Sequence, residues 1–305
     1  MIRRSLKLFA ILSLSVCAPA GMAQEAEPPE SRDTGPEDEI IVTGQADREA
    51  VEALGKAITR PSRAGQPVAR FDAPVCLKVS GLPADMAELV ADRIRANIET
   101  VRGVEVAADG CSPNAFVGVL NNVNQTVDTL RETETWLFEG LLDYQVDRIY
   151  QGSNAVRAWH VFDLRNLDGS QIPGKQRGTS DEKSIASAVN TVEKASRISQ
   201  LRNNLTGAVV LVETVALSEK TFRQFADYAT VRILASTSDD MDTREGNLPT
   251  ILTLFGSANP PAELTEFDRA YLSALYELPP NSRDGQVIAA AVSRYVEIVE
   301  GTPPG

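Results

Sequence analysis

Residues 73–120 read "APVCLKVSGLPADMAELVADRIRANIETVRGVEVAADGCSPNAFVGVL", and this stretch decides the fold class. Alternating apolar residues predict a half-buried strand, and apolar residues three and four positions apart predict a helix. The predicted order is a strand at 75–79, a turn at 81–83, a helix at 86–101, and short strands at 104–106 and 116–120. We therefore expect a βαββ layer at the start of an α+β fold, with a mixed sheet and packed helices.

The rest of the chain predicts further elements of both kinds. The list comprises a largely helical region at 122–150, strands at 155–164 and 207–217, a helix at 218–236 with Ser218 as its N-cap and Phe222, Phe225, Ala226, Ala229 and Ile233 facing inward, a short apolar segment at 248–255, a helix that begins with the capping box Thr265-x-x-Asp268, and a closing helix at 286–300. We expect one globular domain at 73–300 with a helix-rich C-terminal half. A division into two lobes near 174–200 stays open.

The N-terminus has the pattern of a secretory signal peptide over residues 1–24. Arg3, Arg4 and Lys7 precede a short apolar run, and small residues lead to a cleavage site near Ala23. The apolar run is shorter than the roughly 20 residues that span a bilayer. We therefore expect a periplasmic or secreted protein without a transmembrane segment. Lipidation at Cys17 is an alternative, but Val16 is larger than the residue that usually precedes a lipoprotein cysteine.

The net charge of the chain argues against one class of partner. The formal net charge is −12, and removal of the three signal-peptide bases makes it more negative still. A polyanion is repelled by phosphate backbones, which argues against nucleic-acid binding.

Cys76 and Cys111 are the two cysteines left after cleavage, and in an exported protein we expect them to form a disulfide; two buried free thiols are the alternative.

Residues 25–72 are rich in Glu, Pro, Gly, Ser and Arg and poor in large apolar residues. Such a segment cannot bury enough apolar surface to offset its ordering entropy, so we predict a disordered acidic tail. Ile40, Ile41 and Val42 interrupt it as a short β-prone run. Acidic residues directly upstream discourage such runs from pairing with one another.

Glu39, Ile40, Ile41, Val42, Thr43 and Gly44 resemble the TonB box of TonB-dependent outer-membrane receptors of alphaproteobacteria. That box adds a strand to the sheet edge of the energy-coupling protein TonB. The resemblance implies that residues 39–44 bind TonB or another periplasmic protein. It covers these six residues only, and the chain is too short for a receptor barrel. Docking of the run on the protein's own sheet, or no role, are the alternatives.

The sequence contains little catalytic equipment. His160 is the single histidine, which excludes a multi-histidine metal site. It is either a catalytic base or a core histidine with a bonded ring N–H, and the lack of a Gly-x-Ser-x-Gly motif favours the core. Asp143 and Asp147 lie four apart on a predicted helix and are interpreted as surface charge.

The acidic residues at 239–245 allow either calcium binding or a solvated loop. The cluster comprises Asp239, Asp240, Asp242 and Glu245, and its spacing does not match an EF-hand, which favours the solvated loop. We predict no metal and no cofactor.

The last third weakly resembles degenerate secreted metallopeptidase-like domains of unknown function. Asp227 to Val231 stand where such enzymes carry His-Glu-x-x-His, and neither zinc-binding position is histidine. The resemblance implies a scaffold that binds without cutting. We expect a non-catalytic binding protein of the cell envelope, coupled to TonB through its tail. An exported hydrolase that uses carboxylates is the alternative.

Overall fold

The computed structural model describes residues 48–60, 66–139, 141–151, 155–172, 201–238 and 248–301. Their strands are β1 (Arg70–Phe71), β2 (Leu77–Ser80), β3 (Ala115–Leu120), β4 (Val156–Asn166) and β5 (Leu201–Glu213). The helices are α1 (Arg48–Ile58), α2 (Ala84–Glu99), α3 (Val123–Thr133), α4 (Asp143–Gln151), α6 (Phe222–Leu234), α7 (Glu266–Glu277) and α8 (Asp284–Val299), with short 3-10 turns η1 (Thr135–Phe138), η2 (Thr214–Leu217) and η3 (Ile251–Thr253). The predicted α+β class is confirmed.

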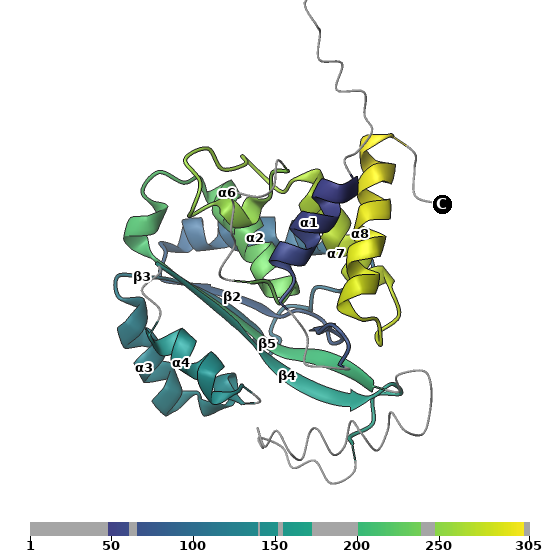
Figure 1. The fold of residues 1–305 in the computed structure, drawn as a ribbon. Coiled ribbons are helices and arrows are strands. Elements are labelled where there is room, and N and C mark those ends of the chain that lie inside the picture. Colours follow the sequence, from purple (N-terminus) through teal and green to yellow (C-terminus); the bar gives the residue numbers. More distant parts are fainter. Residues whose placement is uncertain are drawn as a thin grey trace, which may run out of the picture. The chain divides into compact units, whose positions relative to one another are not determined.

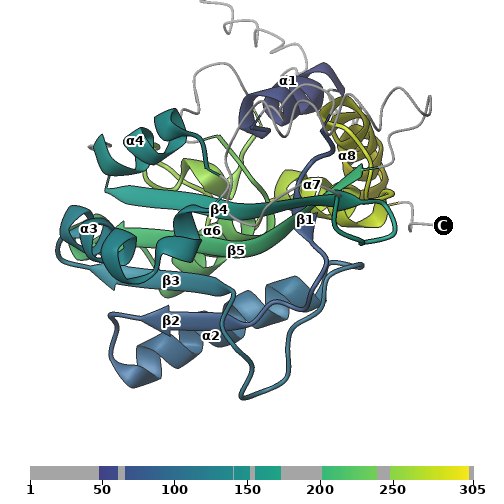
Figure 2. The same cartoon turned by 90° about the horizontal axis from the view of Figure 1, so that it is seen from below.

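The five strands form one mixed sheet around β5. Along one side of β5 runs β4, antiparallel, and along its other side lie β3 and β1, both parallel. β2 pairs in parallel with β3 and stands at the end of the sheet. The strand order is therefore β4, β5, β3, β2, and Figure 2 shows β2 at the edge opposite β4.

The predicted βαββ layer is present with one difference. β2, α2 and β3 form a parallel strand–helix–strand unit, but the expected strand at 104–106 is reduced to a single bridge between Val75 and Val106. The turn between β2 and α2 requires glycine. Gly81 has φ +85°, and a Cβ there would lie 1.9 Å from the carbonyl oxygen of Val119.

Helices cover both faces of the sheet (Figure 1). On one face α3, η1 and α4 enclose a small core around Trp159, whose indole N–H donates to the Leu137 carbonyl at 2.9 Å. On the other face α1, α2, α6, α7 and α8 bury the main core. The predicted helical region at 122–150 is thus confirmed as α3, η1 and α4.

The N-terminus of α6 corrects two predictions. Ser218 is not the N-cap; it follows η2, and Thr221 caps α6 by accepting a hydrogen bond from the Gln224 amide. Phe222 does not face inward, because the helix begins with it and 39% of its surface is exposed. The other four predicted inward residues are buried. The capping box of Thr265 and Asp268 at the start of α7 is confirmed.

The predicted tail boundary at Asp72 is wrong. Residues 48–58 form α1, an amphipathic helix that buries Val51, Leu54 and Ile58 in the main core. β1 also lies before the predicted boundary. Val51, Leu54 and Ile58 have helical spacing, but their polar neighbours dominate the composition of the region.

Other predictions fall outside the described residues. These are the signal peptide at 1–24, the tail before residue 48 and the lobe boundary near 174–200. Residues 44–305 group as one unit. Among the helices that the structure describes, none has both the length and the apolar character to cross a membrane.

Candidate strand-addition site

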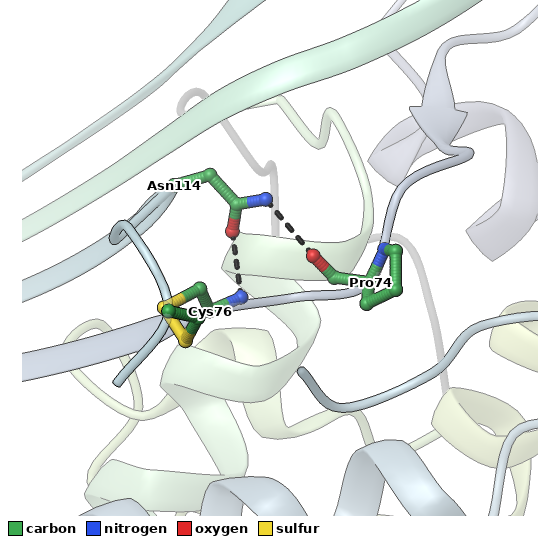
Figure 3. The surroundings of a disulfide bond; sticks show 4 residues. Pro74, Cys76 and Asn114 are labelled. Carbon is green, nitrogen blue, oxygen red and sulfur yellow. Dashed lines mark hydrogen bonds between the residues drawn. A yellow bond between two sulfur atoms is a disulfide. The ribbon is translucent and has the colours of Figure 1, made fainter. Parts of the chain in front are cut away.

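A disulfide and one asparagine side chain fix the start of β2. Cys76 and Cys111 are bonded, with their Cα atoms 6.0 Å apart, which confirms the predicted pairing. The Asn114 side chain accepts a hydrogen bond from the Cys76 amide (2.8 Å) and donates one to the Pro74 carbonyl (3.0 Å), as Figure 3 shows. The Cys76 carbonyl accepts from the amides of Asn114 and Ala115, each at 3.0 Å. The entry to β2 is thereby tied to the entry to β3.

Among the strands that the structure describes, β2 pairs only with β3, and its backbone faces no strand on the other side. Val75 points to this side, where its amide donates to the Glu105 carbonyl (2.7 Å) and its carbonyl accepts from the Ala107 amide (3.0 Å). Backbone groups alternate in direction along a strand, so those of Leu77 and Val79 point to the same side as those of Val75. Within the described residues, no backbone or side-chain group pairs with them there. We call the amides and carbonyls of Leu77 and Val79 the outer edge of β2.

The side chains of β2 divide into an apolar row and a polar row. Leu77 and Val79 are partly buried and pack against the main core, whereas Lys78 and Ser80 are exposed on the opposite face. Open edges bind extended segments through backbone hydrogen bonds, while alternate side chains give selectivity. A short edge with a lysine also resists indiscriminate pairing. The outer edge of β2 therefore has the chemistry of a selective strand acceptor.

The predicted partner-binding residues Glu39, Ile40, Ile41, Val42, Thr43 and Gly44 lie outside the described residues. Their attachment point is described, because α1 begins at Arg48 and is anchored by its buried face. Four Cα steps separate Gly44 from Arg48, which reach at most about 14 Å. Whatever binds residues 39–44 is consequently held close to the start of α1.

His160 lies in the core, as the favoured interpretation of the sequence predicts. It is 3% exposed on β4, and its Nε2 lies 3.1 Å from the Ile233 carbonyl at the end of α6. Burial lowers the pKa of His160 to about 3, and the nearby charges of Arg60 and Arg232 act in the same direction. The ring is thus neutral and acts as a buried donor.

Asp227 joins three elements. Its carboxylate accepts two hydrogen bonds from Arg93 on α2 (2.7 and 2.9 Å), one from Asn97 (2.7 Å) and one from the Leu264 amide (2.9 Å). Burial alone would raise the pKa of Asp227, but these hydrogen bonds outweigh it and hold the pKa below its ordinary value. Asp227 thus forms an ion pair with Arg93 that holds α6 against α2.

A second buried carboxylate, Asp268, stabilises the entry to α7. It accepts hydrogen bonds from the Thr250 hydroxyl (2.6 Å), the Ile251 amide (2.9 Å), and the amide and hydroxyl of Thr265 (3.0 and 2.8 Å). Burial raises the pKa of Asp268, against the effect of these donors. Its oxygens are occupied by the ends of α7 and η3, so its role is structural.

The remaining candidate acids are surface groups or are not described. Asp143 and Asp147 are exposed on α4, as predicted. The acidic loop at 239–245 lies outside the described residues. Among the described ranges, no group of three or more His, Cys, Asp or Glu side chains is placed to hold a metal ion.

Comparison with known proteins found no family, no curated protein and no solved structure that matches this chain. The site is therefore argued from its own geometry. The sequence predicted the alternation of Val75, Leu77 and Val79 but did not predict that β2 stands at the sheet edge. Strand order depends on contacts between distant segments, and no local pattern in the sequence indicates it.

Proposed function

We propose that the protein is an exported interaction protein of the cell envelope that binds by strand addition, with residues 39–44 donated to the sheet edge of a periplasmic partner such as TonB. The observation that carries the proposal is the run Ile40-Ile41-Val42, placed between acidic residues and a helix that is anchored in the folded body. β-branched residues suit an added strand, in which backbone groups supply affinity.

The anchoring of α1 supports this role. Val51, Leu54 and Ile58 are at most 7% exposed, so the helix that follows the donated run is part of the folded body. A partner bound to residues 39–44 is then held beside α1. Tethering of this kind raises the effective concentration of the body at the partner's surface.

The buried polar groups support binding rather than turnover. His160, Asp227 and Asp268 each form hydrogen bonds that join helices or strands of the body. Each of these side chains is at most 3% exposed. Groups held in this way lack the access to substrate that acid–base catalysis needs.

The test is a titration of a labelled peptide of residues 37–46 with a TonB C-terminal domain. We expect saturable binding that Val42→Pro abolishes, because proline removes a backbone donor, and that Val42→Thr preserves, because threonine keeps the amide and the β-branch. A pull-down from envelope extract with mature protein, with and without residues 25–46, identifies other partners. Absence of saturable binding, or equal binding of the proline peptide, would exclude TonB as the partner.

A further inference from the structure

We propose that the outer edge of β2 accepts residues 39–44 of a second copy of this chain, so that copies associate head to tail. The inference uses the same donor, residues 39–44, as the proposed function, but its acceptor is the outer edge of β2 and not the sheet of a TonB-type partner. It can therefore fail while the proposed function holds, and the reverse is also possible.

The acceptor is defined by the hydrogen-bonding geometry of β2. The backbone of Val75 already forms hydrogen bonds with Glu105 and Ala107 on the outer side, so this side of the strand can pair with an extended segment. The next backbone groups on the same side belong to Leu77 and Val79. Together they offer two donors and two acceptors, enough to align an extended segment of four to six residues.

The side-chain rows of β2 match those of residues 39–44. In an added strand Ile40 and Val42 share one face, and they would extend the apolar row of Leu77 and Val79. Glu39, Ile41 and Thr43 would share the opposite face, where Lys78 is exposed.

The charges favour this pairing over pairing between two tails. Two copies of residues 37–44 would bring their acidic residues together, which is unfavourable. The Lys78 ammonium instead offers the Glu39 carboxylate an opposite charge.

The attachment of residues 39–44 to α1 favours a donor from a second copy over the chain's own run. α1, to which the run is joined at Arg48, packs against α8, and Figure 2 shows both helices on the side of the fold opposite β2. The link from Gly44 to Arg48 reaches at most about 14 Å, which holds the chain's own run near the start of α1.

Donation in trans has consequences for assembly. The donor and the acceptor are different surfaces of one chain, so the contact is heterologous and extends into open chains or closed rings. A strand of this length buries less surface than a standard stable interface, so association is weak and concentration-dependent.

The test is sedimentation velocity of the mature chain over a concentration series. Val79→Pro removes one outward amide and leaves the pairing of β2 with β3 intact, because Val79 points away from β3. Val79→Ala is the matched control, since it loses similar packing but keeps the amide. We expect wild type and Val79→Ala to show a rising sedimentation coefficient, and Val79→Pro and Val42→Pro to remain monomeric.

Mixing the two proline variants sharpens the test. Val42→Pro keeps a working acceptor and Val79→Pro keeps a working donor, so their mixture should form a one-to-one complex that neither forms alone. Lys78→Glu should weaken association several-fold, and adding Glu39→Lys should restore it. An excess of the 37–46 peptide should dissociate the wild-type assembly, and this measurement needs no variant of the folded body.

Three results would overturn the proposal. One is a wild-type chain that stays monomeric across the concentration series. Another is association of Val79→Pro equal to that of Val79→Ala. The third is an assembly that the 37–46 peptide does not dissociate.

Discussion

Acidification below pH 6.5 should destabilise the protein through His160. The ring is buried and neutral, and its Nε2 bonds the Ile233 carbonyl at 3.1 Å. Its folded-state pKa is about 3, below the ordinary value of 6.5. An unfolded chain therefore takes up a proton as the pH falls through 6.5, whereas the folded chain does not. The contribution of His160 to the free energy of unfolding is fully present above pH 6.5, and it is lost as the pH falls from there toward 3.

The size of the effect follows from the two pKa values. Between pH 7 and pH 5, linkage gives a loss of about 2 kcal/mol in the free energy of unfolding. This loss hardly changes for any folded-state pKa below 4, because the folded ring stays neutral over the whole interval. No other histidine is present to contribute.

Urea unfolding at pH 7 and pH 5 measures the loss directly. With a urea dependence of about 3 kcal/mol per molar, the midpoint of wild type should fall by roughly 0.7 M. His160→Gln keeps an N–H donor for the Ile233 carbonyl but does not titrate, so the histidine contribution should vanish from its pH dependence. Asp268, whose pKa is raised, contributes equally to both proteins and cancels in the comparison. Equal shifts in wild type and His160→Gln would refute the reasoning.

Four further outcomes are expected. Replacing Cys76 and Cys111 together by serine should lower the free energy of unfolding by on the order of 4 kcal/mol, and a reductant should shift the thermal midpoint of wild type but not of the double variant. Asp227→Asn should cost about 3 kcal/mol in urea unfolding because Arg93 loses its buried partner, whereas Asp92→Asn, at an exposed ion pair with Arg95, should cost less than about 0.5 kcal/mol. Thr265→Ala should cost about 1–2 kcal/mol by removing the cap of α7, measured in the same way, and a cost near zero would contradict the capping role. Leu54→Ala should cost about 2–4 kcal/mol or release α1, which limited proteolysis near residue 48 would detect against a Glu52→Ala control.

Local patterns predicted the elements whose formation depends on neighbouring residues. The alternation in β2, the apolar spacing in α2 and the glycine turn between them are short-range signals, and the structure contains all three. The same holds for the capping box at Thr265. A capping box also begins at Thr221, three residues before Gln224, and this signal would have placed the start of α6 correctly.

Local sequence patterns do not predict the features that depend on contacts between distant residues. α1 has a helical apolar spacing, yet it gains stability only by packing against α8 and the main core. The ion pair between Arg93 and Asp227 joins residues that are 134 positions apart. The edge position of β2 arises because β3 and β5 pair with each other, and nothing within residues 75–80 indicates this pairing.

Chain connectivity explains why none of the described segments pairs with the outer edge of β2. After Ala107 pairs with Val75, the chain must return to form the disulfide at Cys111 and to enter β3 at Ala115, on the other side of β2. Residues 108–114 therefore cannot continue along Leu77 and Val79. Removing the disulfide would relax this constraint and let the segment after Ala107 compete for the same backbone groups. The disulfide thus stabilises the fold and also keeps the proposed acceptor unoccupied by the chain's own loop, so the double serine variant should bind the 37–46 peptide more weakly than wild type at a temperature where both are folded.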